Sequence, residues 1–181
     1  MKRVGTTVQT AGFTIVELAT VILVIGILAT LVTMGYAGLQ ERARDSTRVS
    51  DMKTLAKALD VHKSRNGSFP DRSPSASSWA SSHLHPTDYI SGIAGSGLSL
   101  KTLPIDPVND STYRYVYDVY PAESYGCDKS LGSYYVLFIP RMETVPAGSA
   151  HPDSPGFSCS GRNWATESGG AAWVQGGFIY S

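Results

Sequence analysis

A long apolar segment near the N-terminus constrains this chain more than any other feature. It covers residues 13–39 and contains one charged side chain, Glu17, five positions after Gly12. A helix of about 20 residues spans the hydrocarbon core of a bilayer, so this segment is long enough to cross one. A charged side chain in such a helix is costly, and where it occurs it usually has a function. The sequence therefore predicts a transmembrane helix in which Glu17 has a specific role.

The residues where this apolar segment begins carry a family resemblance. The run Gly12-Phe13-Thr14-Ile15-Val16-Glu17-Leu18 resembles the processing site of type IV prepilins and pseudopilins. The resemblance implies that residues 1–12 are a leader, which a membrane peptidase removes between Gly12 and Phe13 before it methylates the new amine of Phe13. It also implies that Glu17 acts in assembly, by pairing with the positive Phe13 amine of a neighbouring subunit and so setting the register of a filament.

The flanking residues predict how the precursor is oriented. Lys2 and Arg3 precede the apolar segment, so the positive-inside rule places the N-terminus in the cytoplasm and the bulk of the chain outside. A secretory signal has a shorter apolar core, and its small-residue cleavage site follows that core. Here Ala11 and Gly12 come before the apolar run, so we expect the segment to be retained. The expected location is the cytoplasmic membrane as a single-pass precursor, and then an extracellular filament.

The two cysteines, Cys127 and Cys159, both lie in the part that is expected to be exported. An even number of cysteines in an oxidising compartment favours a disulfide. Such a bridge would close a loop of about 33 residues and stabilise the fold by about 2–4 kcal/mol. Two buried free thiols are the alternative, which would be reasonable in a cytosolic protein.

After the apolar segment the pattern becomes amphipathic over residues 40–66. Apolar side chains recur there at spacings of three and four residues, at Val49, Met52, Leu55, Ala56 and Leu59. We therefore expect one long helix from Phe13 to about Ser64, with its second half packed on the remainder of the chain. Asn66-Gly67 is a typical helix end.

The remaining residues predict a small β-rich head. Residues 67–102 are rich in Ser, Gly and Pro and form a connector, while residues 103–181 supply the head. Strands are predicted over 113–120, 134–139 and 172–180, the last with a bulge at Gly176-Gly177. The predicted class is α+β: a long N-terminal helix, half of it transmembrane, packed on a small antiparallel sheet as in pilins.

Sequence motifs favour a structural role over catalysis or nucleic-acid binding. The chain has no Gly-x-Ser-x-Gly, no phosphate-binding Gly-Lys-Ser/Thr and no His-Glu-x-x-His motif, so we assign no catalytic residue and expect no enzyme. Its 15 basic and 15 acidic residues balance, which does not favour a nucleic-acid partner. No cofactor is expected and no metal site is assigned. Some pseudopilin heads bind calcium, however, and loop oxygens for that ion could come here from Asp106, Asn109, Asp110 and Asp128.

We expect a structural subunit of a type IV pilus-like filament, or fimbrium. The partners implied by the resemblance are further copies of the chain, the prepilin peptidase, an assembly ATPase and its membrane platform protein. Two alternatives stay open. One is a minor pilin or pseudopilin of a type II secretion or DNA-uptake system. The other is a membrane-anchored extracellular binding domain, for which Glu17→Ala should leave function intact.

Overall fold

Helix α1 (Ile15–Asn66) is the longest element of the chain. The computed structural model describes residues 12–166 and 170–180, and the chain divides between residues 40 and 41 into two compact units. Residues 1–11, which form nearly all of the predicted leader, lie outside the described residues. The helix ends where the sequence predicts. Gly67 takes a positive φ of 70° and donates its N–H to the carbonyl oxygen of Lys63 at 2.8 Å.

In the first unit, the N-terminal part of α1 exposes its apolar side chains. Ile15 is 88% exposed, Leu23 64% and Leu31 65%. Within the residues that the structure describes, no helix combines the length and the hydropathy that a membrane crossing requires. The transmembrane segment expected over residues 13–39 stays a prediction.

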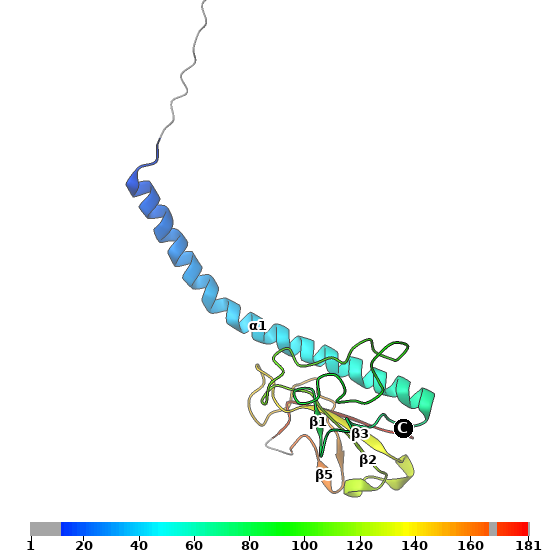
Figure 1. Cartoon of the computed structure of the whole chain (residues 1–181). Helices are drawn as coiled ribbons and strands as arrows, with labels where there is room; N and C mark the ends of the chain where they lie inside the picture. Colours follow the sequence, from blue (N-terminus) through cyan, green and yellow to red (C-terminus); the bar gives the residue numbers. More distant parts are fainter. Residues whose placement is uncertain (1–11, 167–169, 181) are drawn as a thin grey trace, which may run out of the picture. The chain divides into compact units, whose positions relative to one another are not determined.

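In the second unit, the C-terminal half of α1 packs on one face of a β-sheet (Figure 1). The buried side chains of the helix are the ones whose spacing predicts this face: Met52, Leu55, Ala56 and Leu59. Burial of their apolar surface is the main force that holds the helix to the head, at about 25 cal/mol per Å². The predicted α+β class is confirmed.

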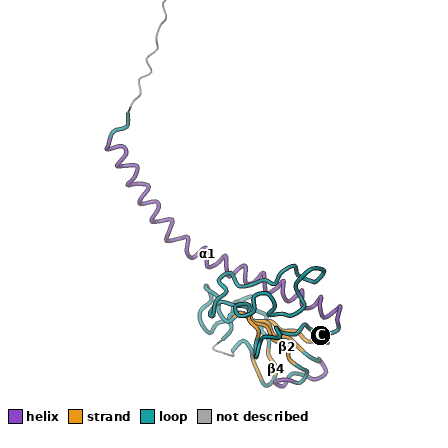
Figure 2. The backbone as a smooth tube through the Cα atoms, viewed as in Figure 1, coloured by secondary structure: helices purple, strands orange, loops and turns teal. Residues whose placement is uncertain are grey.

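The sheet is antiparallel and has four strands, shown in orange in Figure 2. Their order is β1 (Ala80–Ser81), β2 (Val116–Tyr120), β3 (Tyr134–Ile139) and β6 (Trp173–Phe178). Strands β2, β3 and β6 lie within the three predicted segments. Strand β1 comes from the predicted connector, and its two residues are too few to give a strand pattern. Alternate residues of β3 serve two cores: Tyr135, Leu137 and Ile139 pack with α1, and Tyr134, Val136 and Phe138 pack on the other face.

The bulge predicted at Gly176-Gly177 is wrong. The pairing of β3 with β6 is unbroken there, with Val136 opposite Gly176 and Tyr135 opposite Gly177. A Cβ on Gly176 would lie 2.3 Å from the ring of Phe157, and one on Gly177 would lie 2.8 Å from the ring of Tyr135. The two glycines therefore make room for aromatic rings on the sheet, which is the other common reason for glycine inside a strand.

A second layer packs on the face of the sheet that α1 leaves open. It contains the hairpin of β4 (Ser158–Cys159) and β5 (Arg162–Asn163) and the 3-10 turns η1 (Ser124–Gly126) and η2 (Lys129–Leu131). The rings of Tyr134, Phe157 and Trp164 lie 5.4–5.7 Å apart between their centroids. The guanidinium of Arg162 lies over the Tyr125 ring at 4.5 Å. Aromatic packing thus builds the second core.

Candidate functional site

The predicted processing bond lies in open backbone just before α1. Gly12 and Phe13 precede the first helical residue, Ile15, and Phe13 is 91% exposed. Among the described atoms, none lies within 4 Å of a Cβ built on Gly12. Exposed, non-helical chain with small residues is the preferred substrate of proteolysis. The geometry at this bond is therefore compatible with cleavage between Gly12 and Phe13.

The carboxylate of Glu17 caps the start of its own helix. Thr14 donates to Glu17 Oε2 from its backbone N–H at 2.9 Å and from its hydroxyl at 2.6 Å. In return, the backbone N–H of Glu17 donates to Thr14 Oγ1 at 3.2 Å. This reciprocal arrangement is a capping box, which satisfies backbone N–H groups that the first helical turn leaves without partners.

Sequence reasoning gave Glu17 an intermolecular role and overlooked Thr14. The signal was present, because Thr-x-x-Glu before an apolar run is the sequence signature of a capping box. The local bonds explain how an acid is accommodated at the start of an apolar helix. The two hydrogen bonds that Thr14 donates to the carboxylate both end on Oε2. The other carboxylate oxygen, Oε1, is therefore compatible with a second partner.

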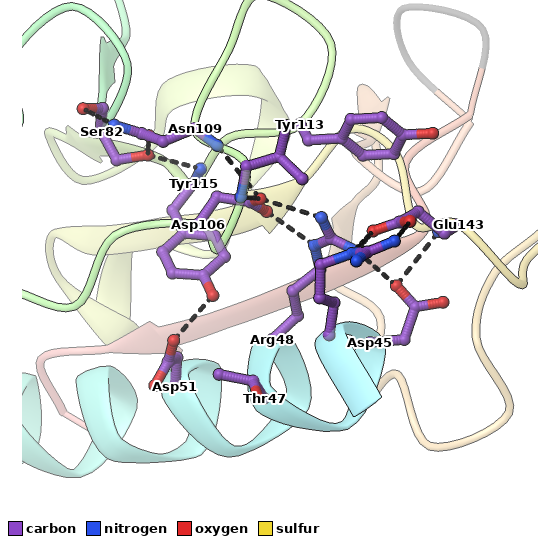
Figure 3. A network of polar contacts seen from close by, with 12 residues as sticks. Asp45, Thr47, Arg48, Asp51, Ser82, Asp106, Asn109, Tyr113, Tyr115 and Glu143 are labelled. Carbon is purple, nitrogen blue, oxygen red and sulfur yellow. Dashed lines mark hydrogen bonds and ion pairs between the residues drawn. The ribbon is translucent and has the colours of Figure 1, made fainter. Parts of the chain in front are cut away.

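In the second unit, the most concentrated set of charges surrounds Arg48 of α1 (Figure 3). Arg48 donates to Asp106 from Nε to Oδ2 at 2.7 Å and from Nη2 to Oδ1 at 2.9 Å. Its Nη1 donates to Asp45 at 2.7 Å and to Glu143 at 2.8 Å. The Tyr113 ring covers the guanidinium, with 4.9 Å between Cζ and the ring centroid. The side chain of Arg48 is completely buried, so these partners replace its hydration.

One further residue, Arg44, completes what we call the Arg48 cluster, which consists of Arg44, Asp45, Arg48, Asp106 and Glu143. Arg44 binds Glu143 through Nε at 2.7 Å and through Nη2. Asp45 accepts hydrogen bonds from the backbone N–H groups of Glu143 at 3.0 Å and Thr144 at 2.7 Å. The cluster therefore ties three places in the chain together: the helix, the loop around Asp106, and the segment after β3.

Electrostatics in the cluster favour the charged forms of Asp45 and Glu143. Burial alone would raise the pKa of Asp45, but hydrogen bonds from Thr144, Glu143 and Arg48 outweigh it and lower the pKa below its ordinary value. The Arg44 hydrogen bond, helped by Arg48, holds the pKa of Glu143 below its ordinary value against the effect of burial. These carboxylates are structural anions at neutral pH.

Asp51 behaves in the opposite way one turn further along α1. Its Oδ2 accepts a hydrogen bond from the hydroxyl of Tyr115 at 2.7 Å. Burial raises the pKa of Asp51, and the nearby charge of Asp106 raises it further, against the lowering effect of the Tyr115 hydrogen bond. Folding therefore makes the ionised form of Asp51 less favourable than it is in the unfolded chain.

The four residues considered for calcium already have partners in the protein. Asp106 binds Arg48, Asn109 exchanges hydrogen bonds with Ser82, Asp110 accepts the N–H of Tyr113, and Asp128 caps η2 through the N–H of Ser130. In the described part of the chain, no three His, Cys, Asp or Glu side chains group as they would around a metal ion. Asp106 anchors a loop to α1 through its bonds with Arg48.

The expected disulfide is present between Cys127 and Cys159. Their Cα atoms are 4.8 Å apart, across 32 positions of sequence. The bond joins the end of η1 to β4, and so ties together the two parts of the second layer, the loop between β2 and β3 and the β4–β5 hairpin.

Comparison with known proteins gives relatives of one kind. The chain is 42% identical over 60 residues to the type II secretion system core protein G of Aeromonas hydrophila, 33% over 96 residues to that of Escherichia coli K12, and 32% over 107 residues to that of Vibrio cholerae serotype O1. These alignments cover 33%, 53% and 58% of this chain. They cover 42%, 65% and 69% of the relatives, so the chain spans less than two thirds of the first two. No family model and no solved structure gives a significant match.

Proposed function

The chain belongs to the family of the type II secretion system core protein G, and on that basis we propose that it is a pseudopilin, a filament subunit of a secretion system. Among the alternatives that the sequence leaves open, the relatives favour a secretion system over a pilus fibre or a DNA-uptake system. The role is structural: the charged groups of the Arg48 cluster bind one another inside the head.

The observation that carries this proposal is the exposed apolar surface of α1 in the first unit. Side chains all round the helix are exposed, including Val16 at 71%, Ile22 at 63% and Leu28 at 56%. Apolar surface on this scale has to be covered, since each Å² left in water costs about 25 cal/mol. We propose that lipid covers it in the precursor and that the helices of neighbouring copies cover it in the filament.

Glu17 supplies the specificity that apolar contacts lack. On cleavage after Gly12, the amine of Phe13 becomes a positive charge four residues before Glu17. In a dry core of packed helices, the Phe13 amine of one copy would pair with Glu17 of the next, while Thr14 holds the carboxylate in place. A copy out of register would leave both charges buried and unpaired, which is strongly unfavourable.

The cellular partners follow from the same proposal. A prepilin peptidase would remove residues 1–12 and methylate Phe13. The precursor would wait in the cytoplasmic membrane with its head outside, until an assembly ATPase and its platform protein add it to the filament. Further copies of the chain are its main partners.

The test separates the charge of Glu17 from its capping bonds. Glu17→Gln removes the charge but keeps an oxygen that accepts the Thr14 hydrogen bonds, whereas Thr14→Ser keeps both the cap and the charge. We expect Glu17→Gln to abolish filaments and Thr14→Ser to leave their yield close to that of wild type. Mass spectrometry of assembled wild-type protein should find N-methylated Phe13 at the N-terminus. Filaments that retain residues 1–12, or that form normally with Glu17→Gln, would contradict the proposal.

A further inference from the structure

We propose that the heads of neighbouring copies join by a contact between two different surfaces: a loop of one head enters a groove on the next. The loop, which we call the knob, is Pro104-Ile105-Asp106-Pro107-Val108. The groove lies between α1 and residues 98–100. This inference rests on the proposed filament function and adds the head-to-head contact to it.

The groove is preformed and has an apolar floor. It has a volume of about 510 Å³ and is lined by Thr54, Lys57, Ala58, Val61, Arg65, Leu98, Ser99 and Leu100. Its outer wall is held by backbone hydrogen bonds, from Leu100 N to the Ile93 oxygen at 3.1 Å and from Gly95 N to the Leu100 oxygen at 2.8 Å. Leu98 remains 47% exposed on this wall. A fixed wall means that little conformational entropy is lost when the groove is filled.

The knob presents two aliphatic side chains on a rigid support. Ile105 and Val108 are each 43% exposed, on either side of the fully buried Asp106. Asp106 is clamped by Arg48 and also accepts the N–H of Val108 at 2.9 Å. The carbonyl oxygen of Pro104 accepts the hydroxyl of Tyr89 at 2.7 Å. Apolar side chains held this firmly in water are typical of an interface rather than of a mobile loop.

Charge favours the same pairing. The groove contributes two cations, Lys57 and Arg65, and its lining contains no carboxylate. The knob is followed two residues later by Asp110, whose carboxylate is held by the N–H groups of Thr112 and Tyr113, both at 2.7 Å. Within the same head, His83 and Arg114 also interact electrostatically with the Asp110 carboxylate. An acid beside the knob and two bases in the groove attract one another across the contact.

The positions of the two surfaces along α1 suit an open polymer. The knob is anchored at the level of Arg48, and the groove extends from Thr54 to Arg65. At 1.5 Å per residue, the groove therefore lies roughly 9–25 Å further along the helix axis. When a neighbouring copy lies parallel to the first and is shifted along the helix axis by that amount, its knob is level with the groove of the first copy. Contacts between two different surfaces do not close on themselves unless the rotation closes a ring, so they generate helical filaments.

Cysteine cross-linking tests the contact in the full-length chain in cells. Val61→Cys places a thiol in the groove and Val108→Cys places one on the knob. With both substitutions in one chain, oxidation should give a ladder of dimers, trimers and larger species on a denaturing gel. Each single variant should stay monomeric, because the native cysteines are already paired with each other. Filaments that form with both cysteines present but give no ladder would refute the knob-and-groove contact and leave the proposed function standing.

Charge reversal gives a second measurement that does not depend on cysteine chemistry. Lys57→Glu with Arg65→Glu should reduce filament yield by roughly tenfold or more, because the reversed groove repels the acid beside the knob. Lys53→Glu is the matched control, since Lys53 is exposed on the same helix but does not line the groove. An equal effect of the control and the double reversal would contradict the contact. If the wild-type chain makes no filament at all, the proposed function itself fails.

Discussion

Arg48 holds both carboxylate oxygens of Asp106, a residue 58 positions later in the chain. The side chains of both residues are completely buried. The net stability that such a pair adds over apolar side chains of the same size is small, because both charges lose their hydration. Removing Asp106 is a different matter, since the guanidinium of Arg48 then loses two of its four hydrogen bonds to carboxylates while it stays buried. The pair therefore fixes one arrangement of the loop on the helix.

The first prediction follows from that asymmetry. Asp106→Asn should lower the free energy of unfolding of the head by about 1–3 kcal/mol, because the buried Arg48 guanidinium loses its doubly bonded anion while Asp45 and Glu143 still compensate part of its charge. Urea unfolding of the full-length protein in detergent, followed by tryptophan fluorescence, measures this loss, since all three tryptophans lie in the second unit. Glu123→Gln serves as the control. It breaks the exposed pair with Lys129 and should leave the urea midpoint unchanged. Equal shifts in the two variants would show that burial of the Arg48 pair has no special effect.

The second prediction concerns acid. The folded-state pKa values of Asp45 and Glu143 lie below their ordinary values of 3.8 and 4.5. Their contribution to stability is therefore fully present above about pH 4.5 and is lost as the pH falls through the lower folded-state values. Asp51, whose pKa is raised, acts in the opposite direction and becomes less unfavourable on acidification. We expect the urea midpoint to fall as the pH drops below about 4.5.

A variant isolates the cluster as the source of that acid sensitivity. Glu143→Gln removes one of the two depressed carboxylates, so its urea midpoint should be lower than that of wild type at pH 7 and should fall less steeply with acid. If the acid limb of Glu143→Gln matches that of wild type, the acid sensitivity arises elsewhere in the head. The comparison requires the same salt concentration throughout, because Arg44 and Glu143 are partly exposed and are screened by ions.

Local pattern was enough to predict α1 and the three longer strands, β2, β3 and β6. The apolar spacing from Val49 to Leu59 predicted the buried helix face, Gly67 predicted the helix end, and the apolar run at 134–139 predicted the central strand. Each of these signals depends on neighbours within one or two turns or within one strand. The same is true of the Thr14–Glu17 capping box, which the sequence contained and which was overlooked.

The features that escaped sequence reasoning depend on residues far apart in the chain. A single sequence does not tell which acid meets Arg48, so the sequence offers Asp106 only as a possible calcium ligand. Likewise, Gly176 suggested a bulge because the Phe157 ring that needs its space lies in another segment. Strand β1 pairs through two residues, Ala80 and Ser81, opposite Tyr117 and Val116, and is defined by its partner rather than by its own sequence.

The third prediction tests the packing role of Gly176. Gly176→Ala puts a methyl group 2.3 Å from the Phe157 ring, too close for any real contact, so the ring must move. We expect a loss of about 1–3 kcal/mol in unfolding free energy, as for other overpacked cores. Adding Phe157→Leu should recover part of this loss by freeing space, although Phe157→Leu alone should destabilise. If the two losses simply add, the glycine is not needed to accommodate the ring.

The fourth prediction concerns the disulfide. Reduction of Cys127–Cys159, or replacement of both cysteines by serine, should lower the unfolding free energy by about 2–4 kcal/mol, because the open loop gains conformational freedom in the unfolded chain. The bond fastens the second layer, whereas the Arg48 cluster fastens the helix to two loops on the opposite face. The effects of Cys127→Ser/Cys159→Ser and Asp106→Asn on the urea midpoint should therefore be additive. Strong coupling between the two effects would mean that the two layers of the head do not resist unfolding independently. In that case the amides of β3, a strand that belongs to both cores, would lose protection from hydrogen exchange in either variant alone.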